Sequence, residues 1–188
     1  MSERNRLSKA VGQVASGYLL IHLNINLGTL DILPDWGGYL LICQALAGLK
    51  REDESAGLLK PLGLVLAVWY GIKWVADIVG ASIDIDILSI VATVVSLYFH
   101  FQLLTNLAGI AAAFDCPQRG ALLGLRTVRT VVDTVLQIIV YMGSFEKESW
   151  QAVLLILGVV QLVVLIWLCA ELSGLKKALL SADDGAHL

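Results

Sequence analysis

The chain has 188 residues, of which 57% are hydrophobic and only 15% are charged, and its formal net charge is −3. A soluble domain of this size cannot bury so much apolar surface, and about one quarter of its residues would normally be charged. Composition therefore excludes an ordinary soluble domain and indicates an integral membrane protein, while the small net charge excludes nothing, because in membrane proteins the placement of charge matters more than its sum.

Six apolar segments approach the roughly 20 residues that a helix needs to cross the hydrocarbon core. In chain order they are residues 10–30, 34–49, 61–79, 87–114, 120–142 and 150–170. Only helices and closed barrels satisfy their backbone in lipid, and the segments lack the period-two alternation of a barrel. The predicted fold class is an all-α integral membrane protein with six transmembrane helices. Residues 1–171 form its single domain, and residues 172–188 form a short cytoplasmic tail.

The first segment places Tyr18, His22 and Asn26 at intervals of four residues, so one helix face is polar. Histidine and asparagine inside a span most often hydrogen-bond to a neighbouring helix, and less often bind a ligand or carry a proton. Since this helix runs outward, we expect Asn26 in the outer half of the membrane and His22 near the middle.

The second segment is short, spanning about 24 Å at about 1.5 Å per residue. Trp36 and Tyr39 are predicted to anchor its outer end at the membrane interface. Gly37 and Gly38 would allow a neighbouring backbone, or a ligand, to approach closely. This stretch is therefore either a shallow dip at the mouth of an outward cavity or a tight, well-capped turn.

The third segment opens with Pro61, which suits a first helical turn. It carries Lys73 and Asp77 four residues apart, and the fourth segment carries His100. An ionised side chain at the centre of a span costs about 2.5–3.5 kcal/mol on insertion scales. Such residues usually face the protein interior and mark functional sites.

The fifth segment carries Arg126, Arg129 and Asp133, nearly all on one stripe. Arg126 lies near the inner end, so its side chain can extend to the cytoplasm. Arg129 lies deeper in the membrane, where its guanidinium cannot easily reach water. The sixth segment is the most uniformly apolar, with Gln161 as its only strongly polar interior residue.

The basic residues between the segments predict the orientation. Nine lie before the first segment, after the second, after the fourth or after the sixth, against one in the other three connections. The nine are Arg4, Arg6, Lys9, Lys50, Arg51, Lys60, Arg119, Lys176 and Lys177, and the one is Lys147. By the positive-inside rule, both termini are cytoplasmic. The predicted location is the inner, or cytoplasmic, membrane.

The stretch LDILPDWGGYLL resembles a signature of uncharacterised small bacterial multi-pass membrane proteins, in which ILPD, an aromatic residue and GY follow the first span. That resemblance implies no activity. The six-span plan is also similar, in topology only, to the substrate-binding subunits of energy-coupling-factor transporters. Those subunits show an Ala-x-x-x-Ala face on the first helix, where this chain has Gly12 and Ser16. The second likeness slightly favours transport by analogy.

We expect the polar faces to meet in an outward-facing cavity whose substrate-binding residues are Lys73, Asp77, His22, His100, Asp133, Arg129 and Asn26. Lys73 would face the interior near His22 and Asp133, and would attract an anionic group together with Arg129. Aspartates and histidines would complete hydrogen bonds or carry a coupling proton. The competing interpretation is structural, with Lys73–Asp77 and Arg129–Asp133 as ion pairs within their own helices.

These patterns favour a protein that binds and transports a small anionic or polar solute. The first alternative is a non-catalytic accessory subunit bound to a partner membrane protein, and the second, less favoured, is an intramembrane enzyme. The sequence contains no recognisable catalytic, nucleotide-binding or nucleic-acid-binding motif, and its three cysteines lack the spacing of metal ligands. We therefore expect no catalytic residues, no metal, no cofactor and no nucleic-acid partner. Substrate identity, coupling ion and oligomeric state are left open.

Overall fold

The computed structural model describes residues 3–22, 26–27, 30–31, 34–81, 83, 86–142 and 148–184. Its helices are α1 (Glu3–His22), α2 (Asp35–Leu49), α3 (Glu54–Ile78), α4 (Asp86–Ala113), α5 (Arg119–Met142) and α6 (Glu148–Asp184). Two short strands, β1 (Asn26–Leu27) and β2 (Leu30–Asp31), pair antiparallel between α1 and α2. Apart from this short ladder, the predicted all-helical fold is confirmed.

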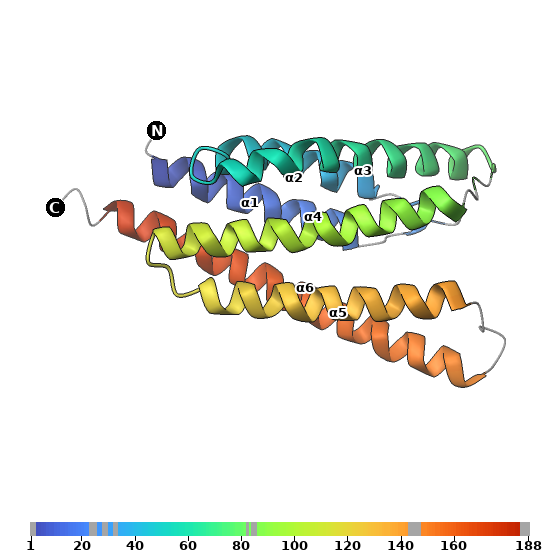
Figure 1. Ribbon diagram of the computed structural model, residues 1–188. Coiled ribbons are helices and arrows are strands. Elements are labelled where there is room, and N and C mark those ends of the chain that lie inside the picture. The colour runs from blue at the N-terminus through green and yellow to red at the C-terminus, as the bar shows by residue number, and fades with distance from the viewer. Residues whose placement is uncertain are drawn as a thin grey trace.

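The six helices run alternately in opposite directions (Figure 1). Each packs against the next helix in the sequence, and α6 packs against α1, so together they form a closed ring. The start of α1 and the end of α6 lie at the same end of the molecule, which we call the terminal end. Inside such a ring, polar faces of several helices can meet away from lipid.

Large apolar side chains fill the interior at the terminal end. Leu7 and Val11, near the start of α1, are fully buried there. The other fully buried leucines of this end are Leu49 on α2, Leu107 on α4, Leu122 and Leu125 on α5, and Leu172, Leu175 and Leu179 on α6. Close packing of these side chains stabilises contacts between helices through van der Waals attraction. The interior towards the opposite end is polar instead.

Helices α1 and α2 come into backbone contact at two glycines. A Cβ atom added to Gly38 would lie 2.6 Å from the carbonyl oxygen of Gly17, and one added to Gly17 would lie 2.8 Å from that of Gly38. Real Cβ atoms do not approach backbone so closely, so both positions require glycine. The prediction that a neighbouring backbone approaches Gly37 and Gly38 is confirmed for Gly38, where the neighbour is α1, but a Cβ on Gly37 would meet nothing within 4 Å.

The first helix is shorter than predicted at its C-terminal end. It ends at His22 and not at residue 30, because the chain turns back in the β1–β2 ladder, where Asn26 pairs in register with Asp31. Residues 24–28, with sequence NINLG, include two asparagines and a glycine, which disfavour helix interiors. Asn26 thus lies on β1 and not on the predicted helix, and its side chain lies outside the described part of the structure.

Helix α3 begins earlier than predicted, because Asp53 caps it. The Asp53 carboxylate accepts hydrogen bonds from the backbone N–H of Ser55 at 3.0 Å and from its hydroxyl at 2.7 Å. A capping carboxylate satisfies the free N–H groups of a first helical turn. Pro61 consequently lies inside the helix, and the prediction that it occupies the first turn is wrong.

Three helices, α3, α4 and α6, are long and apolar enough to cross a membrane. Among the described residues, α1, α2 and α5 do not reach the same length and hydropathy. The outer faces of the ring carry rows of exposed aliphatic side chains, for example Val68 on α3, Val94 on α4 and Leu155 on α6, each at least 60% exposed. Contiguous apolar surface of this extent fits a protein surrounded by lipid.

Helix α6 continues past the predicted end of the sixth span at residue 170, to Asp184. Its 37 residues extend over about 55 Å, well beyond the ~30 Å hydrocarbon core. The first part of the segment expected as a tail is thus helical, and its buried leucines pack at the terminal end.

Candidate functional site

A polar pocket of about 180 Å³ lies inside the ring, nearer to the end opposite the terminal end. Five helices, α1 to α5, supply its lining: Ile21, His22, Asp35, Tyr39, Tyr70, Thr93, Ser96, Leu97, His100, Arg129, Asp133 and Gln137. All of these except Ile21 and Leu97 carry a polar group. Side chains of this kind are rare inside a transmembrane bundle unless they pair or line a hydrated site.

Arg129 and Asp133, one turn apart on α5, form the charged pair of this pocket. Arg129 Nε lies 3.3 Å from Asp133 Oδ2, an ion-pair distance, although the N–H is not aligned for a hydrogen bond. The other carboxylate oxygen accepts a hydrogen bond of 2.6 Å from Gln161 Nε2 of α6. Arg129 is only 6% exposed, and a charge buried to this degree requires its counter-charge nearby.

His22, the last residue of α1, connects α1 to α5. Arg129 Nη2 lies 2.9 Å from His22 Nε2, and because a guanidinium can only donate, Nε2 is the acceptor. His22 Nδ1 lies 2.9 Å from the Tyr18 carbonyl oxygen, so this nitrogen carries the hydrogen and donates it. The imidazole is therefore held as its neutral Nδ1-protonated tautomer. Arg129 also lies over the Tyr18 ring, 4.9 Å from its centroid.

His100 on α4 is buried between two tyrosine hydroxyls. Its Nδ1 lies 3.1 Å from the Tyr18 hydroxyl of α1, and its Nε2 lies 3.4 Å from the Tyr39 hydroxyl of α2. The Tyr39 hydroxyl is also 3.0 Å from Ser96 Oγ of α4. Because hydroxyl hydrogens rotate, this chain of groups can either donate to a ligand or accept from it.

The structure brings four of the seven predicted site residues together. His22, His100, Arg129 and Asp133 all line the polar pocket. They come from three helices, α1, α4 and α5.

The other three residues are placed differently. Lys73 and Asp77 do not line the pocket: Lys73 is half-buried, and Asp77 is exposed near the end of α3. The ion pairs between described side chains are Arg6–Glu52 and Arg129–Asp133, so Lys73 and Asp77 are not joined to each other. Asn26 lies on β1.

Tyr39 and Asp35 are pocket residues that the sequence prediction did not include. Tyr39 was expected at the membrane interface, but only 1% of it is exposed, and its ring stacks on Tyr70 with centroids 5.4 Å apart. Asp35 and Tyr39 are four residues apart, so they share one face of α2. That spacing was the available signal in the sequence.

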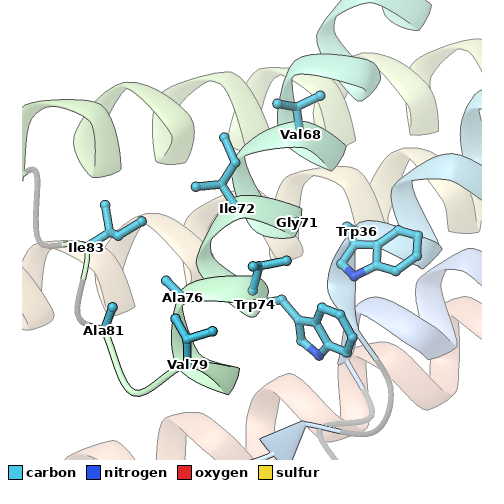
Figure 2. Close-up of a pocket in the computed structure, with 10 residues that line it drawn as sticks. Trp36, Val68, Gly71, Ile72, Trp74, Ala76, Val79, Ala81 and Ile83 are labelled. Atoms are coloured by element: carbon cyan, nitrogen blue, oxygen red, sulfur yellow. The ribbon is translucent and has the colours of Figure 1, made fainter.

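A second cavity is apolar and lies on the side of the molecule along α3. It has a volume of about 590 Å³ and is lined by Trp36 of α2 and by residues of α3 and the segment after it. Figure 2 shows Trp36 and Trp74 on one side of this groove and Ala81 and Ile83 on the other. Its lining has almost no polar group, so the groove can contact hydrocarbon but provides no side chains for catalysis or polar recognition.

Comparisons of the chain with protein-family models, with curated proteins and with solved structures gave no significant match. Function has to be inferred from the side chains of the pocket themselves.

Proposed function

We propose that this chain is a multi-pass protein of the cytoplasmic membrane, with six spans and both termini in the cytoplasm, that binds and transports a small polar solute. The observation that carries this proposal is the polar pocket, in which side chains from five helices converge around the buried Arg129–Asp133 pair. Polar groups of this kind are costly in lipid and are usually retained for function.

The distribution of basic residues supports the orientation. Arg4, Arg6, Lys50, Arg119 and Lys176 belong to helix ends or connections at the terminal end of the ring. Positively charged connections remain in the cytoplasm. With the terminal end inside the cell, the polar pocket lies in the outer half of the membrane and is reached from outside.

The charges of the lining favour a neutral polar group or a cationic group over an anion. Lys73, the residue expected to recognise an anion, lies outside the pocket. Arg129 is balanced by Asp133, and Asp35 adds a second carboxylate. The remaining lining groups are hydroxyls, imidazoles and an amide, which suit a ligand with several hydrogen-bonding groups.

Release of a solute to the other side requires the bonds between helices to rearrange. His22 joins α1 to α5 through one hydrogen bond to Arg129, so a ligand that hydrogen-bonds either group competes with this link. The chain carries no recognisable nucleotide-binding motif. The energy for net transport then comes from an ion gradient or from a partner subunit.

Cysteine accessibility tests this proposal. In a variant with Cys43, Cys116 and Cys169 replaced by alanine, Ser96→Cys places a thiol in the pocket, and Val159→Cys places one on the lipid-facing side of α6 as the matched control. Thiols react with methanethiosulfonate reagents as thiolates, which form only where water reaches. We expect a membrane-impermeant reagent added from outside to label Ser96→Cys at least about tenfold faster than the control.

Equal and slow labelling of both variants would contradict the proposal. A dry interior would instead favour an accessory subunit, in which the polar residues only pair helices. Screening small polyols, amino alcohols and amides for protection of the Ser96→Cys thiol then identifies the class of solute.

A further inference from the structure

The polar pocket borders an apolar groove between α4 and α5, two helices that run side by side in Figure 1. This groove has a volume of about 370 Å³ and lies in the same half of the ring as the pocket. Thr93, Leu97 and Gln137 line both cavities. A molecule held in the pocket can therefore continue into the groove past these three side chains.

Exposure falls steadily from the groove to the pocket. Val94 and Ile138, which line the groove alone, are 60% and 54% exposed. The shared Thr93 is half-buried, and His100 and Arg129 in the pocket are 4% and 6% exposed. The groove thus opens on the surface that faces lipid, and the polarity of its walls increases inward.

We propose that the ligand of the pocket is a single-chain amphiphile that enters from the bilayer, with its hydrocarbon tail in the α4–α5 groove and a neutral hydroxyl-bearing head group in the polar pocket. This inference rests on the proposed function, because it assigns a substrate class to the same pocket. A purely water-soluble solute would leave the adjoining groove to bulk lipid.

The volumes agree with this division of the ligand. At about 30 Å³ per water molecule, the pocket of about 180 Å³ holds about six non-hydrogen atoms, the size of a glycerol unit. On the same measure the groove of about 370 Å³ accommodates about twelve. The hydroxyls of Tyr39 and Ser96 and the amide of Gln137 can hydrogen-bond a glycerol head without a charged partner.

Photo-crosslinking tests the inference on the full chain in phosphatidylcholine nanodiscs. The probe is monododecanoylglycerol with a diazirine in its tail, and the competitors are unlabelled monododecanoylglycerol and free glycerol. We expect tail cross-links on α4 and α5 around Val94 and Ile138, competed by the unlabelled lipid at much lower concentration than by glycerol. Val94→Trp, which fills the groove, should abolish the part of this labelling that unlabelled monododecanoylglycerol competes, because the tail no longer fits between α4 and α5.

The matched control is Val91→Trp, the same change on the exposed face of the same helix at a residue that lines neither cavity; labelling should match that of the wild type. Uniform labelling of exposed helices without competition would mean bulk lipid only and would overturn the inference. Unchanged labelling in Val94→Trp would do the same. If the groove is unlabelled while the Ser96→Cys thiol reacts with aqueous reagent, only the amphiphile inference falls. If the groove is unlabelled and that thiol is also unreactive, both proposals fall.

Discussion

Two helices of this protein carry a basic residue followed four positions later by an aspartate, and their outcomes differ. On α5, Arg129 and Asp133 form an ion pair that extends to His22 of α1 and Gln161 of α6. On α3, Lys73 and Asp77 share the same order and spacing but do not form an ion pair. The sequence pattern is the same, so the difference comes from position in the fold.

Depth along the helix explains the difference. Arg129 lies near the middle of α5, about 15 Å from its start and about 20 Å from its end, and faces the ring interior. Lys73 is five residues from the end of α3, so its ammonium can reach a membrane interface within about 8 Å. Lysine also lacks the planar fork with which Arg129 bonds two neighbours. A charge pair at this spacing therefore indicates a site only when it lies deep in the helix and faces inward.

Replacing the aspartate on each helix should give the largest difference in stability between α5 and α3. Asp133→Leu leaves the buried Arg129 without its counter-charge, so we expect a loss of about 3–5 kcal/mol in unfolding free energy. Asp77→Leu removes an exposed carboxylate that has no ion-pair partner on its own helix, and should change stability by less than about 0.5 kcal/mol. Equilibrium unfolding in mixed micelles measures both. Losses of equal size would show that the two pairs are equivalent.

Alanine substitution at two glycines tests whether the α1–α2 contact holds His22 in place. Gly38→Ala puts a methyl group against the Gly17 carbonyl, so it should cost about 1–3 kcal/mol. A Cβ on Gly71 of α3 would meet Trp36 at an ordinary 3.8 Å, so Gly71→Ala is the control and should be tolerated. If Gly38→Ala also abolishes the coupling between His22 and Arg129, the contact positions α1 for the network.

Double-mutant cycles measure the coupling directly. For His22→Ala with Arg129→Met, we expect a coupling of about 1–2 kcal/mol, because the hydrogen bond has a charged donor and a partly buried acceptor. For Lys73→Met with Asp77→Leu, we expect no more than about 0.3 kcal/mol, because these two side chains form no ion pair. A larger coupling in the α3 pair would mean that these side chains meet when the protein is in lipid.

The smallest expected effect belongs to Lys73→Met alone. Because Lys73 lies outside the polar pocket, this substitution should shift stability by less than about 0.5 kcal/mol. It should also leave the labelling rate of Ser96→Cys unchanged. A clear fall in that rate, or a loss of ligand protection, would show that Lys73 contributes to the binding site.

The sequence predicted the existence of all six helices because each is a long apolar run between polar connections. It also predicted that His22, His100, Arg129 and Asp133 are interior residues, since mid-span polar groups are costly in lipid. The predicted ends of α1 and α3 were wrong, because at each of them hydropathy and a local turn or capping signal favour different boundaries. The asparagines and glycine after His22 end α1 in a ladder, although hydropathy continues, and the Asp53 cap starts α3 before Pro61.

The partners of each polar residue could not be predicted, because rotation of a helix about its own axis decides them. Tyr39 illustrates the point. An aromatic residue near a helix end is as typical of a membrane interface as of an interior. In the structure this face of α2 lies inward, with Gly38 against α1 and the Tyr39 hydroxyl near His100. The spacing of Lys73 and Asp77 likewise holds no information on which way α3 is turned.

Because α6 closes the ring against α1, the ring is incomplete until the last helix has left the ribosome. His22 meets Arg129 across a sequence separation of 107 residues, which take about 5–20 s to translate. During that interval His22 of α1 has no partner on α5. Helix α1 can pack against α2 as soon as α2 is made, whereas its contact with α6 forms only after the rest of the ring has been synthesised.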